Sequence, residues 1–201
     1  MNNTYILSSR QDGVELLHSR LSELPRKGTP LLLAIDGRCA SGKTTLSDGL
    51  SRALSCPVIH MDHFFLPPTM RTPERLSQPG GNVDRERFLQ EVLTPLTDHR
   101  SFAYRPYECH RGDYGCPIEI PLSPVVIIEG SYACHPNLSP AYDLRVFMTV
   151  SLEIQTARIL KRNGEAAARI FADRWIPLEE KYFSVLHPAE SCEMVFDTTF
   201  T

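Results

Sequence analysis

The chain has 201 residues, 21 lysines and arginines against 24 aspartates and glutamates, and a formal net charge of −3. This length suffices for one α/β core with a small insertion, and the acidic balance argues against nucleic acid or an anionic membrane as the main partner. No apolar run approaches the roughly 18 residues of a membrane span, and no signal peptide is recognisable. We therefore expect a cytoplasmic protein of one domain over residues 1–201.

Six cysteines are scattered along the chain without the regular spacing of a secreted disulfide scaffold. The alternative is a zinc site that combines Cys109, His110 and Cys116 with Cys134 and His135, but no Cys-x-x-Cys pair is present. We expect free thiols in a reducing compartment and no zinc.

Residues 1–28 predict an N-terminal helical extension. A short apolar run at residues 5–7 is followed by apolar side chains at helical spacing, which predict an amphipathic helix ending near Pro25. We interpret this segment as packing without chemistry.

An apolar run over residues 31–36 leads directly into a glycine-rich loop and a helical pattern over residues 43–54. The loop comprises Gly37, Arg38, Cys39, Ala40, Ser41, Gly42, Lys43, Thr44 and Thr45. This is the spacing of a phosphate-binding loop in its strand–loop–helix context. Gly42 lets backbone N–H groups close around a phosphate, Lys43 adds positive charge for it, and the Thr44 hydroxyl can ligate Mg²⁺. We expect these residues to bind ATP with Mg²⁺.

A second strand is predicted over residues 57–61 and ends at Asp62. Ligands of open α/β sheets lie beyond the carboxyl ends of the strands. Asp62 is therefore a candidate to accept a proton from a substrate hydroxyl and to help hold the metal, with a cap or turn residue as the alternative. The Pro/Gly-rich segment 66–81 predicts a loop that covers the substrate, or else a surface insertion.

The middle of the chain predicts a helix that begins at Asp84, a β-hairpin insertion over residues 99–121 and a fully apolar strand over residues 125–128. Glu129 ends that strand, which should place it beside the phosphate loop. A carboxylate there can hold the metal or its water, whereas an exposed strand-end acid is the plainer alternative.

Beyond a strand at residues 144–150, a helix is predicted from Leu152 to about Arg162, followed by a lid over residues 162–174. Arg158 and Arg162 are four residues apart and share a helix face, and Arg169 extends the basic run. These guanidinium groups could clamp phosphates in the transition state or form a solvated charged face. A helix at residues 175–186 and a strand at residues 194–196 complete the pattern.

Strands that alternate with helical patterns imply parallel pairing. The expected architecture is a three-layer α/β/α P-loop NTPase fold with a mostly parallel five-stranded sheet and the small hairpin insertion.

In this order, the motifs resemble the uridine kinase and phosphoribulokinase family of P-loop small-molecule kinases over most of residues 30–197. The resemblance rests on the phosphate loop and on the segments 60–65, 81–88, 126–130 and 158–162. It implies ATP-dependent transfer of a phosphoryl group to a small-molecule acceptor.

By this resemblance, Asp62 is the general base toward a sugar 5′-hydroxyl and Asp84 holds the ribose hydroxyls. Tyr107 and His110 fall near positions that contact the base. Arg158 and Arg162 match lid-side arginines. We also expect Lys43 to act as a catalytic group, together with these two arginines, and Arg169 to contact the substrate. Glu129 matches the metal-associated acid. We expect Thr44 and Asp62 to be the other ligands of the metal.

Two departures concern the acceptor. The lid is shorter and less basic than is usual in uridine kinases, and the hairpin has a different spacing. The expected acceptor is a pyrimidine nucleoside, with pantothenate or nicotinamide riboside as alternatives on the same scaffold. A regulatory ATPase and a binding module without turnover are the remaining alternatives, and homo-oligomerisation is left open.

Overall fold

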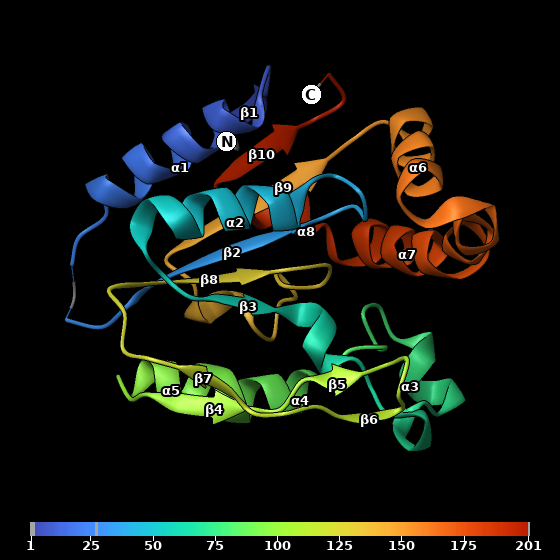
Figure 1. The fold of residues 1–201 in the computed structure, drawn as a ribbon, viewed down its shortest axis with the longest axis horizontal. Helices are drawn as coiled ribbons and strands as arrows, with labels where there is room; N and C mark the ends of the chain where they lie inside the picture. The colour runs from blue at the N-terminus through green and yellow to red at the C-terminus, as the bar shows by residue number, and fades with distance from the viewer. Residues whose placement is uncertain (1–2, 27, 201) are drawn as a thin grey trace.

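The computed structural model describes residues 3–26 and 28–200. At its centre lies a parallel sheet with the strand order β1-β10-β9-β2-β8-β3 (Figure 1). Its strands are β1 (Asn3–Ile6), β2 (Leu31–Gly37), β3 (Val58–His60), β8 (Val125–Glu129), β9 (Leu144–Thr149) and β10 (Met194–Asp197). Because all of them run in the same direction, their carboxyl ends meet at one edge of the sheet.

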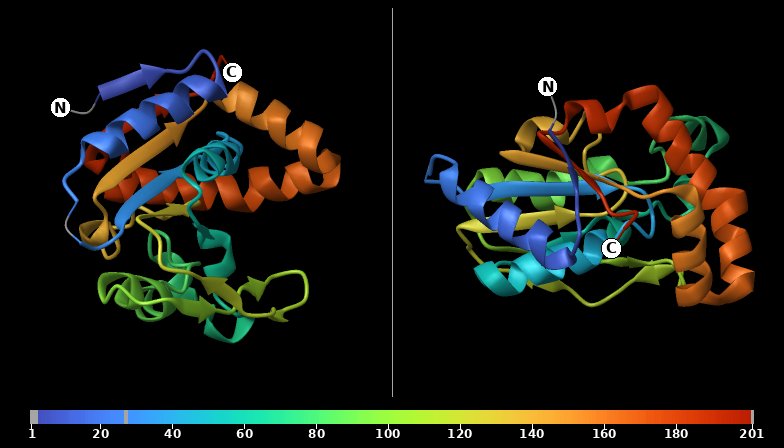
Figure 2. Two further views of the ribbon diagram at one scale, coloured as in Figure 1. Left: turned by 60° about the vertical axis from the view of Figure 1, so that its left-hand side comes forward. Right: turned by 90° about the horizontal axis from the view of Figure 1, so that it is seen from above.

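Helices cover both faces of the sheet. They are α1 (Arg10–Glu23), α2 (Lys43–Leu54), α3 (Pro73–Ser77), α4 (Arg85–Phe88), α5 (Thr94–Thr97), α6 (Leu152–Ile170), α7 (Ile176–Leu186) and α8 (Pro188–Ser191). The three-layer α/β/α P-loop fold predicted from the sequence is therefore confirmed. In Figure 2, α6 and the start of α7 stand beyond the carboxyl ends of the strands.

Strand β2 is buried on both faces, which explains its unbroken apolar sequence. Leu31, Leu33 and Ile35 pack into a core shared with α1 and α2. Leu32 points to the opposite face, into a core that includes side chains of α4 and α7. The rigid centre of the sheet thus delivers the loop after β2 to a fixed position.

The sheet has one strand more than the five expected, counting only residues 3–26 and 28–200. The additional strand is β1, which pairs in parallel with β10, so the segment predicted as a helical extension contributes a strand as well as α1. Most of β1 is exposed at the sheet edge. Its sequence therefore shares only part of the short apolar run at residues 5–7, which is too short to identify a strand by itself.

The predicted hairpin is confirmed as two short antiparallel ladders. Strand β4 (Phe102–Tyr104) pairs with β7 (Ile118–Ile120), and β5 (Tyr107–Glu108) pairs with β6 (Asp113–Tyr114).

The preceding Pro/Gly-rich segment contains a 3₁₀ turn at Pro68–Met70 and the short helix α3. A bridge between Phe65 and Val83 closes it.

The segment predicted as a lid is helical almost throughout. Helix α6 continues past Arg162 to Ile170, with one non-helical residue at Gly164 (φ 78°, ψ 171°), and a π-helical turn at Phe171–Trp175 leads into α7. Alanines at positions 166–168 favour a helix and explain why it resumes after the glycine. Among the described helices, none has the length and apolar character needed to cross a membrane.

Candidate active site

The phosphate loop joins β2 to α2 and depends on two glycines. Gly37 (φ 132°) lies so close to β9 that a Cβ there would be 2.0 Å from the backbone oxygen of Met148. A Cβ on Gly42 (φ 95°) would make only an ordinary contact, at 3.9 Å from Met148 Cε, but the residue occupies a left-handed conformation as the N-cap of α2. The loop therefore curls in front of the N-terminus of a twelve-residue helix, where N–H groups and the peptide dipoles favour an anion.

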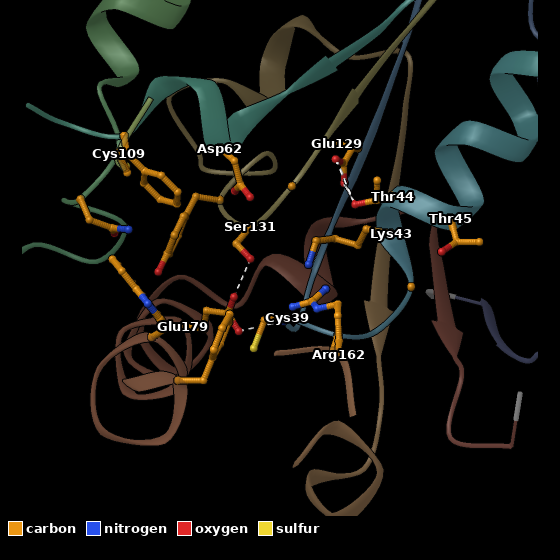
Figure 3. A pocket seen from close by; sticks show the side chains of 18 residues that line it. Cys39, Lys43, Thr44, Thr45, Asp62, Cys109, Glu129, Ser131, Arg162 and Glu179 are labelled. Atoms are coloured by element: carbon orange, nitrogen blue, oxygen red, sulfur yellow. Dashed lines mark hydrogen bonds between the residues drawn. The ribbon is translucent and has the colours of Figure 1, made fainter. Parts of the chain in front are cut away.

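Lys43 is buried beneath this loop and lines a cavity of about 330 Å³ (Figure 3). Its Nζ donates to the backbone oxygens of Gly37 at 2.7 Å and Arg38 at 2.8 Å. The ammonium group is thus held beside the loop, where phosphate oxygens could take over its hydrogen bonds.

Thr44, Glu129 and His60 form a polar cluster on the other side of the cavity. The Thr44 hydroxyl donates to the Glu129 carboxylate at 3.3 Å, and His60 Nδ1 lies 2.5 Å from Glu129 Oε1. His60 and Glu129 are register partners on β3 and β8, which explains their contact. The hydrogen bond to Glu129 raises the pKa of His60.

The oxygen atoms of Thr44 and Glu129 suit Mg²⁺, which uses one or two carboxylates together with phosphate oxygens and water. No group of three or more His, Cys, Asp or Glu side chains within residues 3–26 and 28–200 could hold a metal by itself. The donor set therefore fits a metal shared with a bound nucleotide rather than a metal cage made by the protein alone.

Asp62 follows β3 on a 3₁₀ turn, and its carboxylate faces the same cavity as Lys43 and Glu129 (Figure 3). Asp62 is exposed to solvent at the cavity. Desolvation by the neighbouring protein, together with the negative charge of Glu129, raises the pKa of Asp62, while Lys43 opposes the rise. A carboxylate with a raised pKa is a better proton acceptor than an ordinary surface aspartate.

Helix α7 binds the phosphate loop through two neighbouring acids that the sequence did not single out. Glu179 accepts hydrogen bonds from the backbone N–H of Cys39 at 2.9 Å and from the Ser131 hydroxyl at 2.5 Å. Glu180 forms an ion pair with Arg38. An acidic doublet on a helix normally indicates an exposed face, so only the packing of α7 identifies Glu179 as a residue of the cavity wall.

Asp36 organises the backbone behind the cavity. Its buried carboxylate accepts hydrogen bonds from the N–H groups of Gly37, Tyr132 and Cys134 and from the Tyr182 hydroxyl. Burial raises its pKa, while these hydrogen bonds oppose the rise. Asp36 thus shapes the end of β2 and ties it to the loop that follows β8.

Of the lid arginines, Arg162 lines the cavity, whereas Arg158 lies behind the phosphate loop. Arg158 donates to the Ala40 oxygen at 3.1 Å and to the Thr198 oxygen at 2.7 Å, so its visible role is to support the loop. Arg169 is exposed on α6 and is not among the residues of the cavity wall.

The structure does not bring the remaining acceptor residues to this cavity. Asp84 caps α4 by accepting the Arg87 N–H at 3.0 Å. Tyr107 is buried with its ring against Tyr114, and His110 lies exposed on the hairpin beside Glu108. From the hairpin, Cys109 alone lines the cavity, within the part of the chain that is described.

The rest of the cavity wall, called the acceptor end below, is built from residues that the sequence patterns did not indicate as a site. They are Phe65, Asn82, Ser131, Tyr132, Phe171 and Trp175. Phe65 and Trp175 stack with ring centroids 5.9 Å apart. Tyr132 has a left-handed backbone (φ 74°), which is unusual for an aromatic residue and occurs mostly at functional sites.

No protein-family model matches the chain. Over 174 residues, it is 23% identical to uridine kinase-like protein 3 of Arabidopsis thaliana, a match that covers 76% of this chain and 35% of the relative. Over 150 residues, it is 25% identical to inorganic pyrophosphatase TTM2 of the same plant, covering 69% of this chain and 21% of the relative. The matches thus span only about a third and a fifth of these curated proteins.

Solved structures share the fold over nearly the whole chain. A possible uridine kinase from Bacillus stearothermophilus has a TM-score of 0.71 at 21% identity, covering 93% of this chain and 98% of that one. D-glycerate 3-kinase from Cryptococcus neoformans has a TM-score of 0.58 at 16% identity, covering 85% and 87%. The chain therefore has the P-loop kinase fold, and its motifs and relatives together confirm its resemblance to the uridine kinase and phosphoribulokinase family.

Proposed function

We propose that the protein is an ATP-dependent kinase that transfers the γ-phosphoryl group of ATP to a hydroxyl of a small molecule. The observation that carries this proposal is the meeting of Lys43, Asp62 and Glu129 around one cavity in front of the phosphate loop. Phosphoryl transfer needs these parts: positive charge on the phosphates, a carboxylate for the attacking hydroxyl and oxygen ligands for a metal.

In this mechanism, the N–H groups of the loop and the Lys43 ammonium hold the phosphates and stabilise the charge of the transition state. Asp62 orients the acceptor hydroxyl and takes its proton. Thr44 and Glu129 would hold Mg²⁺, which would neutralise part of the negative charge of the phosphates. Arg162, at the rim of the cavity, is placed to reach the transferring group.

The nucleoside end of ATP has a suitable place behind the loop. A second hollow of about 190 Å³ shares Ala40, Gly42, Thr45 and Arg162 with the first cavity. A triphosphate that follows the loop from Lys43 would lead its adenosine toward this hollow.

We further infer a pyrimidine nucleoside as the acceptor. The support is the resemblance to uridine kinases and the half-buried aromatic pair of Phe65 and Trp175 at the acceptor end. Asp84, Tyr107 and His110 give no support in this conformation, because they serve the fold or lie outside the cavity wall.

The test is ADP release in the presence of uridine, cytidine, nicotinamide riboside, pantothenate or D-glycerate. Acceptor-dependent release with uridine or cytidine is expected. A stronger response to a non-nucleoside would keep the kinase assignment and overturn the nucleoside assignment. ADP release at the same rate with and without any acceptor would instead support a regulatory ATPase.

A further inference from the structure

Asn82 occupies a turn whose backbone is fixed from several sides. The Leu66 N–H donates to the backbone oxygen of Asn82 at 3.0 Å, and the Arg85 guanidinium donates to the backbone oxygen of Gly80 at 2.7 Å. A Cβ on Gly81 would lie 1.8 Å from the Arg75 oxygen, so the turn tolerates no side chain there. The position of Asn82 is therefore imposed by the surrounding backbone.

The Asn82 side chain is buried, with 7% of the residue exposed, yet its amide is not satisfied. Neither the amide nitrogen nor the carbonyl oxygen has a hydrogen-bond partner among residues 3–26 and 28–200. The Tyr132 phenol is near enough for the amide to oppose the rise in the Tyr132 pKa that burial causes, but it does not satisfy the amide. Folded proteins rarely leave such a group unpaired without a functional reason.

The unpaired amide lies at the acceptor end of the candidate active site. Asn82 lines the cavity that contains Asp62 and Lys43, and it also lines an adjoining hollow of about 400 Å³. Phe65 and Trp175 line both spaces with it, and both rings are only half-buried. Asn82 and the two rings therefore share the wall between these spaces.

We propose that Asn82 is a specificity-determining residue that recognises the acceptor, using its amide nitrogen as a donor and its carbonyl oxygen as an acceptor. This inference rests on the proposed kinase function. It assigns a recognition role to a residue that lies in the motif segment 81–88 but was not among the expected site residues. The matching chemistry is an edge that carries a donor and an acceptor side by side. A nucleoside offers two such edges, the vicinal diol of its ribose and the imide edge of a uracil ring.

The decisive variant is Asn82→Leu, which keeps a similar volume and removes both polar atoms. Because two unpaired buried groups disappear, the melting temperature without ligands should stay equal or rise. With uridine as the acceptor, kcat/KM should fall about 10–100-fold, since the complementary edge of the substrate would lose its partners. The KM for ATP should change less than about twofold. Asn137→Leu, at an exposed asparagine, is the matched control. It should leave kcat/KM for uridine and KM for ATP unchanged.

Two analogues distinguish the sources of the recognised edge. If Asn82 binds the diol, wild-type protein should discriminate against 2′-deoxyuridine, and Asn82→Leu should abolish that discrimination. If it binds the imide edge, the same pattern should appear with 3-methyluridine. If Asn82→Leu fails to fold, Asn82→Asp keeps the shape, removes the donor and should still lower kcat/KM at least about tenfold.

The possible failures are separable. Absence of acceptor-dependent turnover with every alcohol would overturn the kinase proposal, and this inference with it. Normal turnover with equal acceptor kcat/KM in wild-type protein, Asn82→Leu and Asn82→Asp would overturn this inference alone. If the best acceptor is not a nucleoside, the same variants are compared on that acceptor, and the same two outcomes decide.

Discussion

The donor and acceptor sides of the cavity are built in different ways. The donor side consists of the phosphate loop with Thr44 and the nearby Glu129, and nearly all of it comes from one continuous segment between β2 and α2. The acceptor side combines Asp62, Asn82 and Tyr132 with rings from the π-helical turn at residues 171–175. On the proposed assignment, the phosphates contact mainly local backbone, whereas the small alcohol contacts side chains that distant segments bring together.

The residues expected on the acceptor side illustrate the difference. Asp84 is a helix cap, Tyr107 is a packed ring of the hairpin, and His110 is exposed beside Glu108. Each of these residue types suits ligand binding equally well. Only their surroundings separate the two roles, and variants on both sides of the cavity test the difference.

The largest effect is expected at Asp62, where the two sides meet. Asp62→Asn should lower phosphoryl transfer by about 10²–10⁴-fold, because an amide cannot take the proton of the acceptor hydroxyl. Binding of Mg-ATP, measured by titration calorimetry, should be largely retained.

Glu129→Gln is the matched contrast to Asp62→Asn. It should raise the Mg²⁺ concentration needed for half-maximal turnover, because a carboxylate that suits the metal is lost. If both variants showed the same change in Mg²⁺ dependence, Asp62 would belong to the donor side as a ligand of the metal.

Lys43→Ala tests the donor side alone. Removing the ammonium group should lower kcat by about 10²–10³-fold, with a smaller loss of ATP affinity. The reason is that the ammonium group stabilises the transition state for phosphoryl transfer more than it stabilises bound ATP. Steady-state kinetics and ATP binding measure the two effects, with Lys161→Ala, on the exposed part of α6, as the control. Turnover near that of the wild type would exclude this loop as the donor site.

The packing beneath the acceptor side should be sensitive to acid. His135 is buried beside Gly80, with Asn137 N donating to its Nδ1, and burial lowers its pKa to about 4. The unfolded chain, with an ordinary histidine pKa near 6.5, then binds a proton that the folded protein does not. Stability should therefore fall as the pH drops through 6.5 toward 4, by about 1–2 kcal/mol at pH 5.

Urea unfolding at pH 7.5 and pH 5.0 measures this dependence. His135→Gln should reduce it without abolishing it, because burial also lowers the pKa of His63 to about 4. His18→Gln, at an exposed position of α1, should leave it unchanged. Equal slopes for His135→Gln and the wild type would show that His135 does not control the acid sensitivity.

The smallest effects are expected at the acceptor residues that the structure places outside the cavity wall. Asp84→Ala should cost about 1 kcal/mol of stability through the lost helix cap, with the acceptor KM unchanged within about twofold. His110→Ala should change neither quantity. A tenfold rise in acceptor KM for Asp84→Ala, without a matching loss of stability, would restore Asp84 to the acceptor site and weaken the contrast between the two sides.

Much of the architecture was readable from local sequence. The apolar runs of β2, β8 and β9 predicted buried parallel strands because both faces of each are covered. The spacing from Gly37 to Thr44 predicted the phosphate loop, since backbone conformation and a helix N-terminus are set by neighbouring residues. Strand β1 was missed because an exposed edge strand carries no such pattern.

Tertiary structure alone decided which polar side chains surround the acceptor end of the cavity. Glu179 belongs to an acidic doublet that a helix could equally expose, and Asn82 directly follows a Pro/Gly-rich segment without periodicity. Each becomes part of the site because separate elements pack at the carboxyl edge of the sheet, α7 against the phosphate loop and the Gly80–Asn82 turn against the aromatic pair. Sequence patterns report periodicity along the chain, whereas these contacts join residues that are far apart in it.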